Sequence, residues 1–411
     1  MDVDKKVKTK TNFDYMPVKL PKATAGRPYV AYLGVNNLPS DPSVNKELER
    51  IGLHHYTDRN RIGGTPKEPG AYDFHFNYRK YNESGMEELS TQTLTLIVEK
   101  EYDIEVDHDP VHHKYWKESV DTRIVDVNQD DKKRLKKNMA AASRRGQQQI
   151  TNVKIREDDF CIRYDEKTRW YALAVADGAG KSIYSCKGSQ IASNSAVGRC
   201  LDRLSKQSGK LRKLTVRYTW RKSNHLLKEI MKMLHEIIAS SVNDAYKDIE
   251  DEAYAQECLP EDYATTLLMC ICKKFEFGWL IGTFGAGDGV ICVYHKDNWY
   301  ANLMGGNEPA AGKSFLTTPG IIQSSEMERR IRFTIVDDFS ALFLMTNGVS
   351  DPKFECETQL HCFELWNKFW DDINAQVNLS GKINDVGEEL LKWLDFWTPG
   401  KNDDRTIAMV F

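Results

Sequence analysis

The chain changes its pattern of hydrophobic and polar positions near residue 100. Before that point apolar residues alternate with polar ones in short runs separated by turns that contain Gly and Pro, such as residues 62–66. Strict alternation of this kind is typical of half-buried antiparallel strands. The strands expected there are 29–35, 70–78 and 93–98. We therefore predict a small all-β sandwich over residues 28–100, preceded by a flexible, polar and basic arm over residues 1–27.

From about residue 145 onwards, apolar strands alternate with amphipathic helices. The expected strands are 160–164, 170–176, 266–273, 277–284, 289–294, 332–336, 341–346 and 406–411. The expected helices are 187–204, 225–249, 364–375 and 386–396. In the second helix Leu227, Ile230 and Leu234 fall on one face, which predicts packing against a sheet. This succession predicts a second domain of mixed α+β class over residues 145–411.

A charged stretch lies between the two regions, and we expect a charged linker over residues 101–144. Its segment 107–113 contains Asp and His residues of the kind that bind metals. Because they form no ligand set of fixed spacing, a solvated linker is the favoured interpretation. The basic run 130–145 predicts a short helix with a solvated face.

Composition and charge narrow the class of protein. A chain of 411 residues, 41% hydrophobic and 28% charged, is globular and too long for one ordinary domain. The formal net charge is -3, whereas a nucleic-acid binder would be expected to carry an excess of basic residues. We therefore expect no nucleic-acid partner. No run reaches the roughly 18–20 apolar residues of a membrane span. Nine cysteines without CxxC spacing, after a charged start, favour a reducing cytoplasm.

Five short acidic motifs carry the candidate chemistry, and most of them follow an apolar strand and adjoin glycine. They are Glu157-Asp158-Asp159, Asp177-Gly178, Gly287-Asp288-Gly289, Asn347-Gly348 with Asp351, and Asp403-Asp404. A strand end holds a carboxylate rigidly, and glycine lets the backbone turn and a metal approach. Carboxylates brought together repel one another unless a cation lies among them, and oxygen ligands suit Mg²⁺ or Mn²⁺. One Asp-Gly is commonly only a turn. The residue types together nevertheless favour a metal-assisted phosphoester hydrolase.

The order of these motifs resembles the PP2C (PPM) family of metal-dependent serine/threonine protein phosphatases over residues 145–411. The similar segments are Asp177–Gly180, Ala264–Leu268, Gly287–Gly289, Thr346–Asp351 and Asp403–Thr406. The resemblance implies a four-layer α-β-β-α sandwich, two or three Mn²⁺ or Mg²⁺ ions, and hydrolysis of phosphoserine and phosphothreonine in proteins by a metal-activated water.

The same resemblance implies a role for each acidic motif. Asp177 would bridge two metals, and the carbonyl of Gly178 and the carboxylate of Glu157 would bind one of them. Asp403 would bind the other metal, and Asp288 a third, weaker ion. Asp158 would act through water beside Glu157.

The sequence departs from the family pattern at three positions. Asn347 stands where the family has a metal-ligating Asp, and the loss of one negative charge predicts weaker metal binding and lower turnover. It is either natural divergence, leaving a weak enzyme or a pseudoenzyme, or an engineered change. Ala179 stands where many eukaryotic members have His. Val153 stands where the phosphate-binding Arg is expected, so Arg156 is the candidate, with Lys154, Arg144 and Arg145 as further substitutes.

Two finer resemblances concern partners. Residues 29–98, with the motif at 62–98, resemble bacterial immunoglobulin-like modules of the putative-Ig or cadherin-like kind, which would make the first domain an immunoglobulin-like sandwich over residues 28–100. The helix entry at Tyr184–Ala192 resembles a bacterial branch found in stress or tellurite-resistance clusters. That branch implies a phosphoprotein substrate, a cognate Ser/Thr kinase or a von Willebrand A-type protein as partner. The alternative function is an impaired pseudophosphatase that binds phosphoproteins, or acts as a scaffold, through its immunoglobulin-like module.

Overall fold

The structure is a computed structural model of the whole chain. It describes residues 20, 22–32, 42–56, 61–81, 87–99, 115, 117–127, 136–146, 155–296, 299–304, 314–318, 320–354, 357–396, 398 and 401–411. Two compact units divide the chain between Asp103 and Ile104. None of the described helices is long and apolar enough to cross a membrane.

The first unit is rich in β-structure. One sheet has the order β1-β6-β5 and the other the order β2-β4-β3. Its elements are β1 (Ala23–Thr24), β2 (Tyr29–Tyr32), α1 (Pro42–Arg50), β3 (Leu53–Tyr56), β4 (Arg61–Gly64), β5 (Gly70–Tyr81) and β6 (Glu87–Glu99). Buried Phe74 of β5 and Leu94 and Leu96 of β6 alternate with exposed neighbours, as the sequence pattern predicts.

Three expectations for this unit need correction. Residues 61–64 form strand β4 where a turn was expected, because they pair with both β2 and β3. Ala23 and Thr24 lie in the predicted arm but pair in parallel with Val98 and Glu99 of β6. Helix α1 was not predicted. Residues 1–19 of the arm lie outside the described residues, and the immunoglobulin-like assignment stays a prediction.

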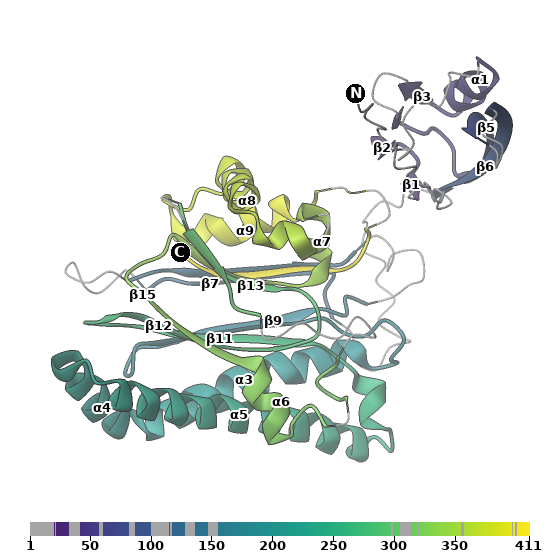
Figure 1. Cartoon of the computed structure of the whole chain (residues 1–411). Coiled ribbons are helices and arrows are strands. Elements are labelled where there is room, and N and C mark those ends of the chain that lie inside the picture. The colour runs from purple at the N-terminus through teal and green to yellow at the C-terminus, as the bar shows by residue number, and fades with distance from the viewer. Residues whose placement is uncertain are drawn as a thin grey trace, which may run out of the picture. The chain divides into compact units, whose positions relative to one another are not determined.

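The second unit is a four-layer α-β-β-α sandwich, which confirms the predicted fold class (Figure 1). One sheet has the order β15-β12-β11-β10-β9 and the other the order β14-β13-β16-β17-β8-β7. Their bounds are β7 (Val120–Val125), β8 (Met139–Arg144), β9 (Asp159–Asp165), β10 (Trp170–Ala176), β11 (Leu267–Phe275), β12 (Gly278–Ala286), β13 (Val290–His295), β14 (Trp299–Asn302), β15 (Ile331–Val336), β16 (Ala341–Met345) and β17 (Arg405–Val410).

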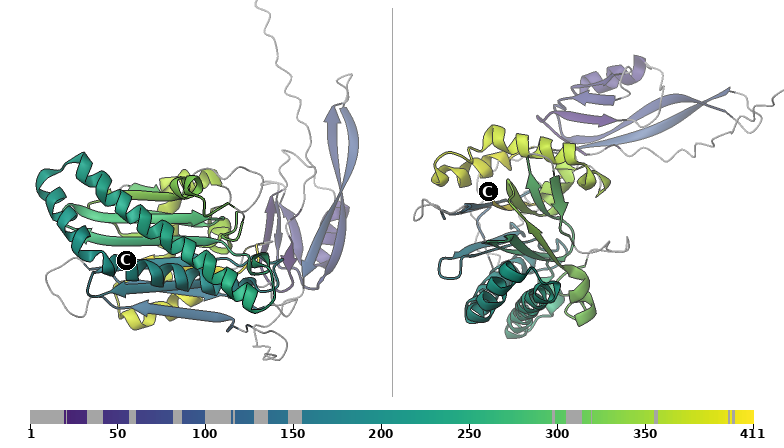
Figure 2. Two further views of the ribbon diagram at one scale, coloured as in Figure 1. Left: turned by 90° about the horizontal axis from the view of Figure 1, so that it is seen from below. Right: turned by 60° about the vertical axis from the view of Figure 1, so that its left-hand side comes forward.

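Helices cover the outer face of each sheet (Figure 2). Their bounds are α3 (Ser185–Lys206), α4 (Ser208–Arg221), α5 (Asn224–Ala255), α6 (Ser324–Arg330), α7 (Asn347–Lys353), α8 (Phe363–Gln376) and α9 (Ile383–Trp393), with short 3₁₀ helices at Pro260–Tyr263 and Glu357–His361. The side chains of Leu173 and Val175 in β10 enter the core between the sheets, whereas Ala172 and Ala174 face the helical layer of α3 and α5. Both faces of β10 are therefore buried, which explains its continuous apolar sequence.

The expected linker over residues 101–144 is wrong for two stretches. Residues 120–125 and 139–144 form β7 and β8, and β8 pairs with β17 from Arg405 to Val410. The second stretch was expected to be helical. Its alanines are fully buried in a sheet instead, because tertiary packing overrides the high helix propensity of alanine.

Candidate functional site

The acidic motifs lie at one end of the two central sheets. Ala176, the last residue of β10, pairs with Asp159, the first residue of β9, so the motifs at 157–158 and 177–178 lie side by side. In the other sheet Met345 at the end of β16 pairs with Val290 of β13 and Ile407 of β17. The motifs that precede β13 and β17 and follow β16 therefore share that sheet's end.

Two glycines bring these segments into close contact. A Cβ on Gly178 would lie 2.8 Å from the carbonyl oxygen of Glu157. Gly289 has a φ of +105°, and a Cβ there would lie 2.5 Å from the carbonyl oxygen of Met345. A side chain at either position would push the acidic loops apart, which explains the glycines that follow Asp177 and Asp288.

Serines on the first turns of α3 hold Glu157 from the helical side. The hydroxyl of Ser185 donates to Oε1 of Glu157 at 2.8 Å, and the hydroxyl of Ser189 donates to its carbonyl at 2.5 Å. Glu157 is 9% exposed. The hydroxyl of Ser185 therefore fixes the orientation of the Glu157 carboxylate at this end of the sheet.

Threonines fix the other strand-end loops. The N–H of Asp177 donates to Oγ1 of Thr266 at 2.8 Å, and Oγ1 of Thr265 donates to the carbonyl of Asp177 at 3.0 Å. The hydroxyl of Thr346 donates to Oδ2 of Asp158 at 2.8 Å and accepts from the N–H of Thr406 at 3.1 Å. Each carboxylate position is therefore defined by a neighbouring strand.

Asp158 and Asp404 are buried acidic residues, and the backbone N–H of Asp158 donates to the carboxylate of Asp404. Asp158 is 1% exposed, and burial, with Asp404 and Asp403 nearby, raises the pKa of its carboxyl well above the ordinary value. Burial also raises the pKa of Asp404, which binds the N–H groups of Gly146, Glu157 and Asp158 at 2.6, 2.5 and 3.2 Å. Crowded carboxyls of this kind are common at functional sites.

Asn347 begins α7 and faces Asp288. Its Nδ2 lies 3.4 Å from Oδ2 of Asp288, and the residue is 8% exposed. Its Oδ1 is buried and has no hydrogen-bond partner among the described residues. Buried acceptors are normally satisfied, so this oxygen is available to a cation or a water molecule.

The site also contains a residue that sequence reasoning missed. Lys117 is buried, and its Nζ donates to the carbonyl of Asp158 at 2.9 Å, to Oδ2 of Asp159 at 3.0 Å and to Oγ of Ser189 at 3.2 Å. Burial lowers the pKa of its ammonium group. Lys117 lies in the stretch that was taken for a linker, and nothing in the local sequence marks it.

The guanidinium of Arg156 is buried and occupied by hydrogen bonds within the protein, which disfavours its assignment as the phosphate ligand. Its Nε donates to the carbonyl of Glu118 at 3.1 Å, and one terminal nitrogen donates to Oγ of Ser143 at 2.7 Å and to the carbonyl of Asp158 at 3.0 Å. The other terminal nitrogen lies 3.8 Å from Asp121. Arg144 is likewise paired, with Asp395 at 2.9 Å. Residues 153 and 154 lie outside the described residues.

The residues present fit a hard cation by their chemistry. All candidate ligands are oxygens, and the buried Oδ1 atoms of Asp158, Asn347 and Asn402 have no hydrogen-bond partner within the described part of the chain. No three His, Cys, Asp or Glu side chains of the described residues form a metal-ligand group by themselves. The remaining ligands would be the amide of Asn347, the carbonyl of Gly178 and water.

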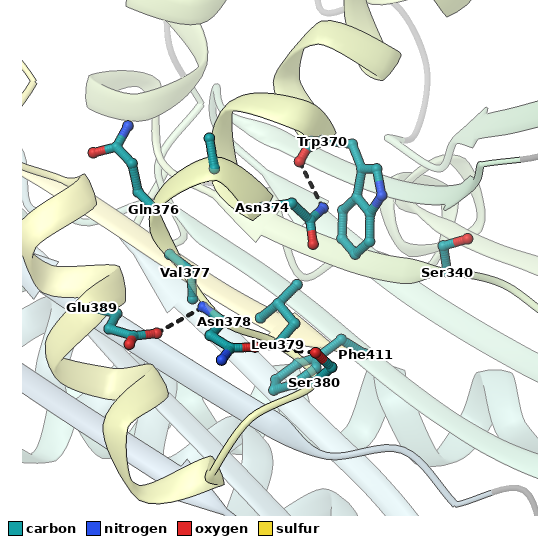
Figure 3. Close-up of a pocket in the computed structure, with 11 residues that line it drawn as sticks. Ser340, Trp370, Asn374, Gln376, Val377, Asn378, Leu379, Ser380, Glu389 and Phe411 are labelled. Atoms are coloured by element: carbon teal, nitrogen blue, oxygen red, sulfur yellow. Dashed lines mark hydrogen bonds between the residues drawn. The ribbon is translucent and has the colours of Figure 1, made fainter.

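Two hollows of the second unit lie away from this cluster. One, of about 480 Å³, lies beside α8 and the chain end at Phe411, with Trp370, Asn374 and Glu389 in its wall (Figure 3). The other, of about 1110 Å³, lies between α4 and the opposite ends of β9–β12. None of the acidic motif residues lines either hollow.

Sequence comparison identifies the family of the second unit. Residues 145–395 match the family described as protein phosphatase 2C. The chain belongs to the protein phosphatase 2C family. Comparison with curated proteins finds no match.

Solved structures of phosphatases resemble this protein phosphatase 2C domain at low sequence identity. A bacterial serine phosphatase is 13% identical, with 66% of this chain and 96% of that chain covered and a TM-score of 0.40. Serine/threonine phosphatase Stp1 from Staphylococcus aureus is 15% identical, with 66% and 93% covered and a TM-score of 0.38. The catalytic domain of PstP in complex with 2 manganese ions is 12% identical, with 66% and 96% covered and a TM-score of 0.35.

Proposed function

We propose that the protein hydrolyses phosphoserine and phosphothreonine in proteins, with Mn²⁺ or Mg²⁺ as cofactor. The observation that carries the proposal is the joining of acidic residues from both sheets. Hydrogen bonds link Glu157 to Asp404 and Asp158 to Thr346, and each pair spans the two sheets of the sandwich. These contacts bring the carboxylate motifs to one end of the fold, and the match to the protein phosphatase 2C family supports the proposal.

The chain's own residues would hold the ions and keep their surroundings rigid. Glu157, Asp177, the carbonyl of Gly178 and Asp403 are the proposed ligands for two ions, with Asp288 and Asn347 around a third. Bound ions would supply an activated water and counter-charge for the phosphoryl oxygens. Asp158, which accepts a hydrogen bond from Thr346, would orient water beside Glu157. The carboxylates need little rearrangement because Ser185 and Thr266 already hold their loops.

A thiol nucleophile is disfavoured by the surroundings of the nearest cysteine. Cys186 follows Ser185 on α3 and is 2% exposed. Burial raises the pKa of its thiol, so the reactive thiolate is suppressed near neutral pH. This environment supports direct attack by water without a covalent intermediate.

The alternative function is a pseudophosphatase that binds a phosphoprotein without turning it over. Asn347 is the observation that favours it, because the neutral amide replaces a carboxylate that would face Asp288. The first unit would then act as the docking module. A cognate Ser/Thr kinase or a von Willebrand A-type protein is the partner proposed for either function.

The two functions are separated by an assay of the full chain with p-nitrophenyl phosphate and a phosphothreonine peptide. We expect Mn²⁺-dependent hydrolysis that Asp177→Asn abolishes and Asn347→Asp raises by about tenfold. The exposed Asp371→Asn is the matched control and should leave the rate unchanged. Binding of the phosphopeptide without hydrolysis by either the unsubstituted chain or Asn347→Asp would favour the pseudophosphatase.

A further inference from the structure

The larger hollow of the second unit is a groove with a basic lining. It has a volume of about 1110 Å³ and lies between α4, the β9–β10 turn and the β11–β12 turn. We name it the basic groove after its six cationic residues, Lys136, Lys167, Arg169, Arg212, Lys273 and Lys274. Glu276 is the single acidic residue in its lining.

The cations of the basic groove have no carboxylate within ion-pair distance among the described residues. The nearby carboxylate of Asp165 is used by its own turn, where it accepts from Oγ1 of Thr168 at 2.5 Å and from the N–H of Lys167 at 3.0 Å. The surface of the basic groove is therefore positively charged, although the whole chain has a formal net charge of -3. Such a concentration of positive charge attracts an anionic partner.

The fold holds several of these cations in place. Nζ of Lys273 donates to the carbonyl of Thr168 at 2.6 Å and lies 5.0 Å from the ring centre of Phe275. Lys274 donates to the carbonyl of Asp337. Arg169 has a φ of +62°, an uncommon conformation for a residue with a side chain, and its N–H bonds the carbonyl of Asp165 at 2.6 Å. Ordering these groups in advance lowers the entropic cost of binding.

Helix α4 adds an apolar anchor to the groove. Trp220 is 84% exposed and Val216, one turn earlier, is 50% exposed, and both line the groove. Only Leu211 and Thr215 of α4 are buried. A large exposed tryptophan beside arginine is the composition of protein-binding hot spots.

The groove is remote from the acidic cluster. β9 runs from Asp159 at the cluster to Asp165 at the groove, a span of about 20 Å for an extended strand. α4 and α7 accordingly lie at opposite ends of the sheets (Figure 1). The groove's other indoles, Trp170 and Trp279, are fully buried, so Trp220 is the exposed indole of the lining.

We propose that the basic groove binds an acidic peptide segment of a partner protein, with an apolar side chain of that segment packed on Trp220 and Val216. Carboxylates of the segment would pair with the exposed cations of the β9–β10 turn and α4. The site is separate from the proposed phosphatase centre, and binding there needs neither metal nor phosphate.

The test uses the full chain and a fluorescein-labelled peptide of about twelve residues, in which Asp and Glu surround one Leu and one Phe. Binding is followed by fluorescence anisotropy with EDTA present. The groove variant is Lys167→Glu/Arg212→Glu, and Trp220→Ala tests the anchor. The matched control is Lys213→Glu/Arg217→Glu, which makes the same charge change at exposed positions of α4 outside the groove.

We expect the groove variant to weaken peptide binding by at least about tenfold, Trp220→Ala by about fivefold, and the control by less than about twofold. A peptide with Asn and Gln in place of Asp and Glu should not bind. No saturable binding of the acidic peptide overturns the proposal, as does equal weakening by the groove and control variants. Tighter groove-dependent binding of an oligothymidylate of similar length would also overturn it.

Discussion

The backbone N–H of Glu157 donates a hydrogen bond of 2.5 Å to Oδ2 of Asp404, 247 positions later in the chain. The same carboxylate also binds the N–H groups of Gly146 and Asp158. Asp404 precedes β17 and Glu157 precedes β9, so one side chain ties the ends of the two sheets together. The positions of the proposed metal ligands thus depend on a residue that need not touch a metal.

Replacement of the Asp404 carboxylate tests whether it links the ends of the two sheets. Asp404→Ala leaves three buried N–H groups without their acceptor, and we expect a loss of about 3 kcal/mol in the free energy of unfolding. All nine tryptophans lie after residue 104, so urea unfolding followed by tryptophan fluorescence reports the second unit alone. The exposed Asp371→Ala should change the free energy by less than about 0.5 kcal/mol. Equal free energies of unfolding for Asp404→Ala and Asp371→Ala would contradict a linking role for Asp404.

Asp158→Asn should stabilise the metal-free protein. Burial and neighbouring carboxyls raise the pKa of Asp158, so its charged form is disfavoured in the fold at neutral pH. The amide removes this charge and keeps an oxygen for Thr346, and we expect a gain of about 1 kcal/mol in urea unfolding with EDTA.

The pH dependence of that gain provides its check. A folded pKa above the unfolded one contributes stability at low pH that is lost as pH rises through the folded value. The advantage of Asp158→Asn over the unsubstituted chain should therefore shrink as the pH falls below the raised pKa of Asp158 towards the ordinary pKa of an aspartic acid. A constant difference across this range would contradict the assignment.

Asn347→Asp should make stability depend on Mn²⁺. In the unsubstituted chain Nδ2 of Asn347 lies 3.4 Å from Oδ2 of Asp288, whereas the variant places two carboxylates there. Like charges repel without a cation. We expect a lower melting temperature than the unsubstituted chain in EDTA and a larger rise on addition of Mn²⁺, measured by calorimetry. Asn347→Ala serves as the control. If Mn²⁺ raises the melting temperature of Asn347→Asp no more than that of Asn347→Ala, a metal at this position is contradicted.

Lys117→Met should destabilise the loop that presents Glu157. The ammonium group contacts Asp159 and the carbonyl of Asp158 while almost fully buried. Its removal leaves a buried carboxylate unpaired, and we expect a loss of about 3 kcal/mol in urea unfolding. The exposed Lys228→Met should have little effect. Adding Asp159→Asn to Lys117→Met should recover part of the loss, and purely additive effects would contradict the pairing.

Most strands of the second unit could be predicted with small boundary errors, because their signal is local, whereas β7, β8 and β14 were not predicted. The expected strand 170–176 coincides with β10, and 341–346 exceeds β16 by one residue. Helix α4 was not predicted, since only Leu211 and Thr215 of its fourteen residues are buried and it lacks a strong apolar face. The alanine-rich strand β8 was read as helix for the opposite reason, because its partners decide its conformation.

The sequence by itself determined which residues carry the acidic motifs, because each motif is a local pattern of a strand end, a carboxylate and a glycine. Tertiary structure alone decided that Lys117 and Asp404 hold these motifs together, and that the guanidinium of Arg156 binds Glu118, Ser143 and the carbonyl of Asp158. It also gathered the cations of the basic groove from α4 and two turns. The physical reason is that these contacts join segments far apart in the chain, and only the packing of the two sheets and their helices brings such segments within hydrogen-bond distance.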